Sequence, residues 1–204
     1  MPIPSVRISH AEQVLDTHAC APLAKLLNEY ENSFYPKDLQ SDYRFIRHWI
    51  DSDFFFCSAR IILDECGNYK PTAVISFLIT SESSITELTA GKIRESQLTP
   101  WDPVQIESRP VVYYASFIRT DNRSVTPLFN NLRRDLLACQ SHFKISQIAA
   151  VYSIAANAMG AAYLKKQGFT RSVFAYLEKY RVFKLSTPSK ARGIWLDALQ
   201  SKGN

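Results

Sequence analysis

Short apolar runs alternate with helical apolar stripes in the second half of the chain. Residues 111–118, VVYYASFI, form an almost continuous apolar run of the kind expected in a buried strand, and residues 145–152 form a second. Between them, residues 127–143 place Leu128 and Leu132 four apart, a spacing that predicts an amphipathic helix. The pattern therefore predicts a β-α-β unit whose two strands pair in parallel through a right-handed crossover.

The remaining stretches of the chain predict strands and helices around that unit. Two strand-like runs, residues 54–64 and 72–80, are joined by a turn signal at residues 65–68, which predicts a β-hairpin. Residues 81–109 are polar, so we expect a long surface insertion with one helical turn near residues 86–95. The other expected elements are a strand at 5–9, helices at 10–28, 37–49 and 157–167, one strand or a bent pair at 174–185, and a short helix at 194–199.

The order of these elements predicts an α/β (α+β) protein with a mixed central sheet. The hairpin adds antiparallel strands to the parallel pair, so we expect a mostly antiparallel sheet of six to seven strands with helices on both faces. The chain has 204 residues, a length that fits one domain with a substantial core. We therefore expect a single domain over residues 1–185 and a C-terminal tail over residues 186–204.

The composition and the cysteine spacing indicate which kinds of ligand and partner to expect. The net charge of +5 favours anionic ligands but is too small to indicate nucleic acid, and we expect no nucleic-acid partner. The four cysteines form no C-x-x-C pair, and none lies near a histidine at metal-binding spacing. We therefore expect no metal and a reducing, cytoplasmic environment. No apolar run approaches about 18 residues, so no membrane span is expected.

Two helix starts are marked by their sequence. Asn157 suits the N-cap of the helix at 157–167, and Gly168 can take the left-handed conformation that ends it. Thr126 suits an N-cap as well, and Pro127 fits the first helical position after it. A strand that leads directly into a helix start builds a cleft lined by backbone N–H donors, which suits a phosphate-bearing cofactor.

The order of elements and the ends of the helix at 157–167 together resemble the GNAT superfamily of N-acetyltransferases. The resemblance spans the chain from Ser5 to about Leu185. It implies an acyltransferase that uses acetyl-CoA or another acyl-CoA as co-substrate and a small-molecule or peptide amine as acceptor. A homodimer is left open. The residues that match are Asn157, Gly160, Tyr163, Gly168 and Phe169.

The resemblance also implies a pyrophosphate-binding turn between the fourth strand and the next helix, with the family pattern [QR]-x-x-G-x-[GA]. Residues 119–124 and 123–128 are the two registers available, and we prefer the second because a helix begins there. Neither register keeps a glycine. Pro127 deletes one N–H donor, and Leu128 places a bulky side chain where a small residue lets phosphate approach. The implied cofactor-binding residues are Phe117, Ile118, Arg119, Arg123, Ser124, Val125, Thr126 and Asn157.

The implied reaction is direct attack of an amine on a thioester. Its carbonyl would lie near Phe117 and Ile118, where a backbone N–H exposed by a bulge or by separation from the fifth strand would stabilise the oxyanion. Many members place a tyrosine seven residues after the helix-opening Asn, but Leu164 stands there. Tyr163 lies one residue earlier, and this rotates it by about 100° and favours a packed position in the core.

A general base must take a proton from the ammonium form of the acceptor. The candidates are Glu107, Tyr113, Tyr114 and Ser116, which lie just before or on the fourth strand. Strict alternation along the strand predicts that Tyr114, Ser116 and Ile118 share one face. The candidate catalytic residues are therefore Tyr163, Tyr114 and Ser116.

Two other functions remain open at this point. The degenerate motif also fits a non-catalytic GNAT-like domain that binds a ligand or a partner. A synthase that takes a longer acyl chain from acyl carrier protein is the other alternative. In that case Phe54, Phe55 and Phe56 and residues 81–109 would line an acyl tunnel, although core packing explains the three phenylalanines equally well.

Overall fold

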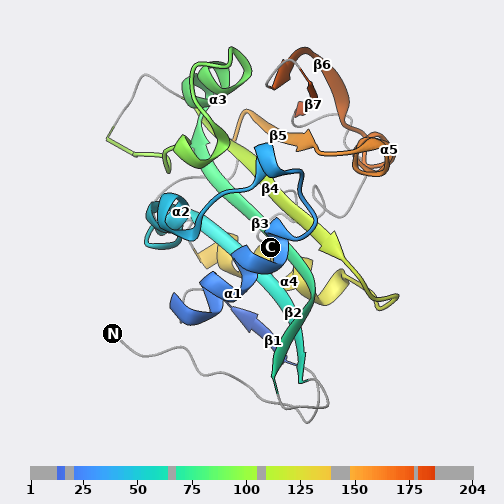
Figure 1. Cartoon of the computed structure of the whole chain (residues 1–204). Coiled ribbons are helices and arrows are strands. Elements are labelled where there is room, and N and C mark those ends of the chain that lie inside the picture. The colour runs from blue at the N-terminus through green and yellow to red at the C-terminus, as the bar shows by residue number, and fades with distance from the viewer. Residues whose placement is uncertain are drawn as a thin grey trace, which may run out of the picture.

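Seven strands of the chain form one mixed sheet. The computed structural model describes residues 13–16, 21–63, 68–104, 109–138, 148–176 and 179–186. The strands are β1 (Gln13–Asp16), β2 (Phe55–Leu63), β3 (Tyr69–Ser81), β4 (Pro110–Arg119), β5 (Ala150–Ala155), β6 (Thr170–Tyr176) and β7 (Tyr180–Ser186). They lie in the order β1-β2-β3-β4-β5-β7-β6, in which β4 and β5 are parallel and the other neighbours are antiparallel (Figure 1). The predicted mixed, mostly antiparallel sheet is confirmed.

Helices cover both faces of the sheet. They are α1 (Ala21–Asn32), η2 (Lys37–Leu39), α2 (Tyr43–Ile50), α3 (Glu82–Thr89), η3 (Glu95–Gln97), α4 (Thr126–Ala138) and α5 (Ala158–Lys166). On one face, Leu128 of α4 and Leu164 of α5 share a buried apolar cluster with Phe77 of β3. On the other face, α2 and α3 bury Trp49 and Leu88 in a second cluster. Figure 1 shows α1 in front of the sheet and α4 behind it.

The hairpin and the β-α-β unit that the sequence predicts are both present. The antiparallel β2–β3 pair runs from Phe55 opposite Leu78 to Leu63 opposite Tyr69. The β4-α4-β5 unit supplies the parallel pair at the centre of the sheet. The C-terminal segment at 174–185 divides into the antiparallel β6 and β7, which matches the bent-pair alternative.

The start of the predicted helix at 10–28 is wrong. Residues Gln13–Asp16 form β1, which pairs with β2 at the edge of the sheet, and α1 begins at Ala21. Proline is tolerated in the first turn of a helix and disrupts an interior, so Pro22 favours a helix that begins just before it. The predicted strand at 5–9 lies outside the described residues.

The described part of the segment at 81–109 contains α3 and η3, which the prediction of a surface insertion with one helical turn did not include in full. Ser81 caps α3 by accepting a hydrogen bond from the Ser84 amide at 3.0 Å. Ile85, Leu88 and Leu98 are buried with Trp49 in the second apolar cluster. The few apolar residues of this segment therefore pack against α2, and their short spacing conceals the pattern in the sequence.

Three element boundaries also differ from prediction. The helix expected at 37–49 divides into η2 and α2, because Asp42 caps α2 by accepting from the Arg44 amide at 2.8 Å. The strand expected at 145–152 is described from Ala150 and continues to Ala155. The expected helix at 194–199 lies outside the described residues. No helix in the described part of the chain is long and apolar enough to span a membrane.

Candidate active site

The two parallel strands at the centre of the sheet pair over three residues and then separate. Val112, Tyr113 and Tyr114 of β4 lie opposite Val151, Tyr152 and Ser153 of β5, and the ladder ends there. The Ser153 hydroxyl donates to the Tyr114 carbonyl oxygen at 3.1 Å, so a side chain satisfies the last carbonyl of the pair. In Figure 1 the two strands, yellow-green and orange, then point in different directions.

A β-bulge lies in β4 at the point where the strands separate. Ser116 lies opposite Ser76 and Tyr114 opposite Phe77, which makes Ala115 the extra residue. The bulge reverses the alternation that follows it. Tyr114 and Phe117 therefore face α4 and α5 with their ring centroids 6.3 Å apart. The prediction that Tyr114 and Ser116 share a face is wrong, because strict alternation does not cross a bulge.

A cavity of about 460 Å³ occupies the opening between β4 and β5. Its walls come from the end of β4, the end of β5, the start of α5 and the segment after α1. Two exposed apolar side chains, Phe34 and Met159, stand at this cavity with 44% and 82% of their surface accessible. Six of the residues predicted from the sequence line it: Tyr114, Phe117, Ile118, Arg119, Asn157 and Tyr163.

Tyr163 reaches the cavity by stacking on Phe117. The two ring centroids are 4.4 Å apart and the ring planes differ by 15°. Burial raises the pKa of Tyr163 above its usual value, although Tyr114 and Arg119 lower it. Burial also raises the pKa of Tyr114 well above its usual value. Both phenols are therefore protonated near neutral pH, and Tyr163 faces the cavity rather than only the core that its rotation predicts.

Asn157 and Gly168 mark the ends of α5 as the sequence predicts. The Asn157 side chain accepts a hydrogen bond from the Gly160 amide at 2.8 Å. Gly168 has a φ of 89°, the left-handed conformation that a glycine adopts at little cost. The cap fixes the helix start beside the cavity, so the first turn of α5 forms part of its wall.

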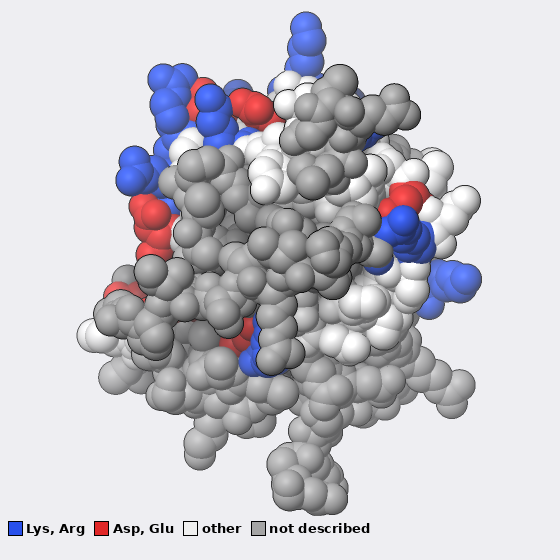
Figure 2. All heavy atoms as spheres, turned by 90° about the horizontal axis from the view of Figure 1, so that it is seen from below, with Lys and Arg blue, Asp and Glu red and all other residues white. Residues whose placement is uncertain are grey.

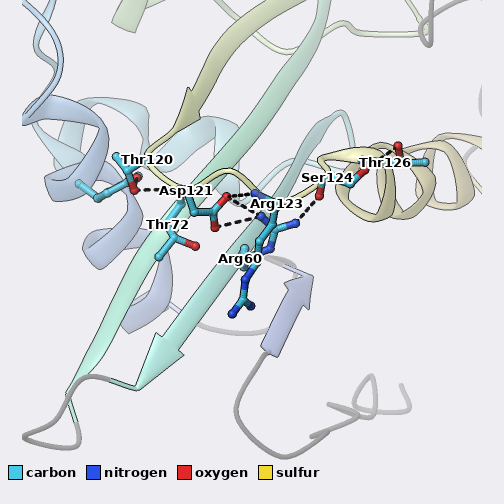
Figure 3. A network of polar contacts seen from close by, with 8 residues as sticks. Arg60, Thr72, Thr120, Asp121, Arg123, Ser124 and Thr126 are labelled. Atoms are coloured by element: carbon cyan, nitrogen blue, oxygen red, sulfur yellow. Dashed lines mark hydrogen bonds and ion pairs between the residues drawn. The ribbon is translucent and has the colours of Figure 1, made fainter.

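A buried ion pair fixes the turn between β4 and α4 (Figure 3). The Arg60 guanidinium of β2 donates to both carboxylate oxygens of Asp121, at 2.9 and 3.0 Å, and to the Ser124 carbonyl. Only 2% of the Arg60 side chain is exposed, against 20% for Asp121. Burial alone would raise the pKa of Asp121, but Thr72 and Arg60 lower it below its usual value. Arg60 thus holds the segment that carries Arg123 and Ser124.

The predicted pyrophosphate-binding residues Arg123, Ser124, Val125 and Thr126 form this turn and do not line the cavity. Two of the turn's amides bond within the turn: Arg123 N donates to Asp121 and Thr126 N to the Ser124 hydroxyl, at 3.1 and 3.2 Å. Thr126 is thus the first helical residue of α4, and its amide is bonded by the Ser124 hydroxyl. The turn is joined to the cavity through Phe117, which stacks with Phe129 of α4 at 6.4 Å.

The bulky residues Leu128, Phe54 and Phe56 are buried in the core. Leu128 does not face the turn where phosphate would approach, because its side chain is fully buried in the core. Phe54 and Phe56 are buried as well, and Phe55 packs against the second apolar cluster. None of the three phenylalanines is among the residues that line the cavity. Core packing, the other explanation that the sequence offers, therefore accounts for their positions.

The other base candidates occupy different places. Glu107 lies outside the described residues. Tyr113 is buried on the α2 face of the sheet, away from the cavity. Ser116 is also buried and lies on the α1 side of β4, where the Tyr35 hydroxyl approaches its oxygen at 3.4 Å. Ser116 therefore adjoins the opening from the side opposite Tyr163.

The sequence reasoning missed three residues: Arg60, Tyr35 and Glu31. An arginine inside an apolar strand pattern was the available signal for Arg60, because a buried cation needs a partner. Tyr35 lines the cavity, and its hydroxyl donates to the Ala115 carbonyl at 3.4 Å. Glu31, one turn earlier, has no sequence signal, since it lies in a helix with ordinary polar residues around it.

A second cavity, of about 550 Å³, lies between residues 38–42, which run from η2 to the start of α2, and residues 94–97 around η3. The carboxylates that line it are Asp38, Asp42 and Glu95, and two of them form ion pairs with basic side chains. Asp38 bonds to Lys179 at 3.1 Å and Tyr180 at 2.6 Å, and Asp42 pairs with Arg44 at 2.7 Å. This cavity therefore presents little net charge from those two groups.

Charges on the surface are mixed in sign. Figure 2 shows one face, on whose described part Lys and Arg side chains lie beside Asp and Glu at the margins. Within the described ranges, no group of three or more His, Cys, Asp or Glu side chains could hold a metal ion. Cys57 is buried.

Comparison with solved structures shows which known fold this chain resembles. No protein-family model matches the sequence, and no curated protein matches it. NAA60 of Arabidopsis thaliana, solved with acetyl-CoA, is 12% identical with a TM-score of 0.50, covering 86% of this chain and 97% of that one. The NatC complex bound to Gag peptide and CoA is 12% identical with a TM-score of 0.50, covering 88% and 98%. The chain therefore has a GNAT-like fold, as the sequence resemblance implied.

Proposed function

We propose that this protein is an N-acyltransferase that uses acetyl-CoA or another acyl-CoA. The observation that carries the proposal is the separation of β4 from β5 after Tyr114, with a cavity in the opening. An extended pantetheine chain fits such an opening, because strand backbone that has lost its neighbour offers hydrogen bonds to the amides of the chain. The thioester lies beside Phe117 and Ile118 in this proposal.

The residues around the opening supply the remaining parts of the reaction. Backbone N–H groups of β4 at and beyond the bulge face the oxyanion that forms when an amine attacks the thioester. Tyr163, protonated near neutral pH, donates a proton to the departing thiolate. The turn at Arg123 and Ser124 holds the pyrophosphate, and the Arg123 and Arg119 side chains provide charge in place of the glycines that the family pattern has there.

The first experiment tests whether acyl-CoA occupies the opening. Gly160 lines the cavity, and a Cβ added there meets only the Asn157 oxygen at 3.6 Å, so Gly160→Phe fills the cavity without a backbone clash. We expect isothermal titration to show acetyl-CoA binding to the unaltered protein and at least about tenfold weaker binding to the variant. Ala162→Phe, on the exposed side of α5, is the matched control and leaves the affinity unchanged.

The same titration tests the turn and the reaction. Arg123→Ala weakens binding by about 1–3 kcal/mol if its side chain pairs with phosphate, and an unchanged affinity means that the register is wrong. Absence of binding by acetyl-CoA, malonyl-CoA and long-chain acyl-CoA below about 1 mM contradicts the proposal. Binding without release of free CoA thiol, across a panel of amines, instead supports the non-catalytic alternative.

A further inference from the structure

A set of polar side chains lies on the α1 side of the bulge in β4. The Tyr35 hydroxyl lies 3.4 Å from both the Ala115 carbonyl oxygen and the Ser116 hydroxyl. Tyr35 also lines the cavity between β4 and β5, and Ser116 is buried behind it with 3% of its surface exposed. The bulge at Ala115 therefore connects the cavity to the opposite face of the sheet through two hydroxyl groups.

Glu31 lies next to Ser116, at the end of the two hydroxyls that is away from the cavity. It lies in the last turn of α1, four residues before Tyr35, and it is partly buried. The Ser116 hydroxyl hydrogen-bonds to the Glu31 carboxylate, and Glu95 of η3 acts on it as a second negative charge. In the ranges that the structure describes, no cation is recorded as an ion-pair partner of Glu31. A carboxylate in this setting holds a proton readily.

We propose that Tyr35 contacts the acceptor amine in the cavity and that Tyr35 and Ser116 pass the ammonium proton to Glu31. The inference rests on the proposed acyl transfer and names its substrate class, a basic primary amine that arrives protonated. Tyr35 is the group that touches the acceptor. Glu31 acts through the two hydroxyls and takes up the proton.

The proton and electron balance of the step is complete. The ammonium gives one proton to the Tyr35 oxygen while Tyr35 gives its own to Ser116, and Ser116 gives its own to the Glu31 carboxylate. The free amine then forms a C–N bond with the thioester carbon, and the C–S bond breaks with its electron pair on sulfur. The nitrogen then passes its second proton to the Tyr163 oxygen as Tyr163 gives its own proton to the thiolate, so Tyr163 ends the step protonated. Glu31 later releases its proton to solvent.

The electrostatics of the set match these roles. Burial raises the pKa of Glu31 to about 8, while Ser116 lowers it and Glu95 raises it. Burial raises the pKa of Glu95 to about 7, although Tyr113 of β4 lowers it. Burial, followed by the charge of Glu31, raises the pKa of Tyr35 far above its usual value. Tyr35 thus stays protonated and can relay a proton, while Glu31 titrates near neutral pH, where a general base is most effective.

The titratable groups that face Glu31 come from three parts of the fold. Tyr35 follows α1, Glu95 lies in η3, and Tyr113 faces Glu95 from β4. Helix α2 and strand β3 also pack on α1. Among the described residues, neither contributes a charged group to those that shift the Glu31 pKa. Glu95 is therefore the charge to alter when the Glu31 titration is tested.

The test compares two amines of similar size with acetyl-CoA as donor. Benzylamine is protonated at pH 7 and needs a base, whereas aniline is unprotonated and does not. We expect Glu31→Gln to slow transfer to benzylamine by about 10²-fold or more and to leave transfer to aniline within about threefold. Tyr35→Phe gives the same pattern. Glu29→Gln, on the same helix with its exposed partner Lys25, is the control and changes neither rate.

A pH profile separates proton transfer from a structural effect. With benzylamine, the rate of the unaltered protein rises with pH and levels off above about 8, because the Glu31 carboxylate is the active form. Glu95→Gln removes a negative charge and moves the midpoint to lower pH. Equal losses with both amines, or an unmoved midpoint, overturn the inference.

Measuring acetyl-CoA binding by calorimetry distinguishes failure of the proton relay from failure of the proposed acyltransferase function. If the unaltered protein binds acetyl-CoA but transfers acetyl to neither benzylamine nor other alkylamines, this inference fails and the cofactor site stands. If acetyl-CoA does not bind, the proposed function itself fails.

Discussion

Removing the charge of Asp121 is expected to destabilise the protein strongly. Asp121→Asn takes from the Arg60 guanidinium, 2% exposed, the carboxylate to which it donates two hydrogen bonds. Breaking a fully buried pair costs about 3–5 kcal/mol, but Asp121 is 20% exposed and Arg60 keeps the Ser124 carbonyl, so we expect about 2–4 kcal/mol. The double variant Arg60→Met with Asp121→Asn is expected to lose less, because it contains no unpaired buried charge.

Urea unfolding followed by circular dichroism measures these free energies of unfolding. Glu29→Gln is the matched control, since its partner Lys25 lies at 3.8 Å on the surface and both side chains are more than half exposed. Such a pair contributes about 0.2–0.5 kcal/mol. If Asp121→Asn costs no more than Glu29→Gln, the assignment of Arg60 as the buried anchor of the β4–α4 turn is refuted. A double variant less stable than Asp121→Asn alone would refute the buried-charge argument.

Two further outcomes are expected. Leu128→Ala is expected to lower the free energy of unfolding by about 2–5 kcal/mol, because the Leu128 side chain is fully buried. The affinity for acetyl-CoA is expected to stay within about twofold. A small loss of stability together with a changed affinity would instead place Leu128 at the phosphate. Because the folded-state pKa of Glu31 is raised from 4.5 to about 8, folded protein retains a proton between these values that unfolded protein loses, so stability falls as pH rises across this interval. Glu31→Gln is therefore expected to gain stability relative to the unaltered protein between pH 5 and pH 9 in thermal melts, and a constant difference would contradict the raised pKa.

The sequence was most informative where one periodic pattern decides an element. The run at 111–118 and the Leu128–Leu132 spacing predict β4 and α4, and Asn157 and Gly168 predict the ends of α5. The edge strand β1 was missed because its place depends on pairing with β2, a contact far away in sequence. Helix α3 was missed because few apolar residues, such as Ile85 and Leu88, suffice to pack it.

The candidate site was predictable only in part. The residues at the β4 end and at the α5 start were found because a motif places them there. The side on which Ser116 lies depends on an extra residue at Ala115, and a bulge has no signature in this strand. Arg60 and Glu31 act through contacts across 61 and 85 positions of sequence, with Asp121 and Ser116, which local patterns do not reveal.

The Ser153–Tyr114 contact bears on how a ligand would enter the opening between β4 and β5, because a side chain occupies the last carbonyl of the paired stretch. The Ser153 hydroxyl satisfies the Tyr114 carbonyl oxygen, and the β4–β5 ladder ends at this point. A ligand that enters the opening does not have to break a β4–β5 backbone hydrogen bond there. Because the opening exists before binding, no free energy is needed to separate the strands. More of the favourable contact free energy therefore contributes to the binding affinity.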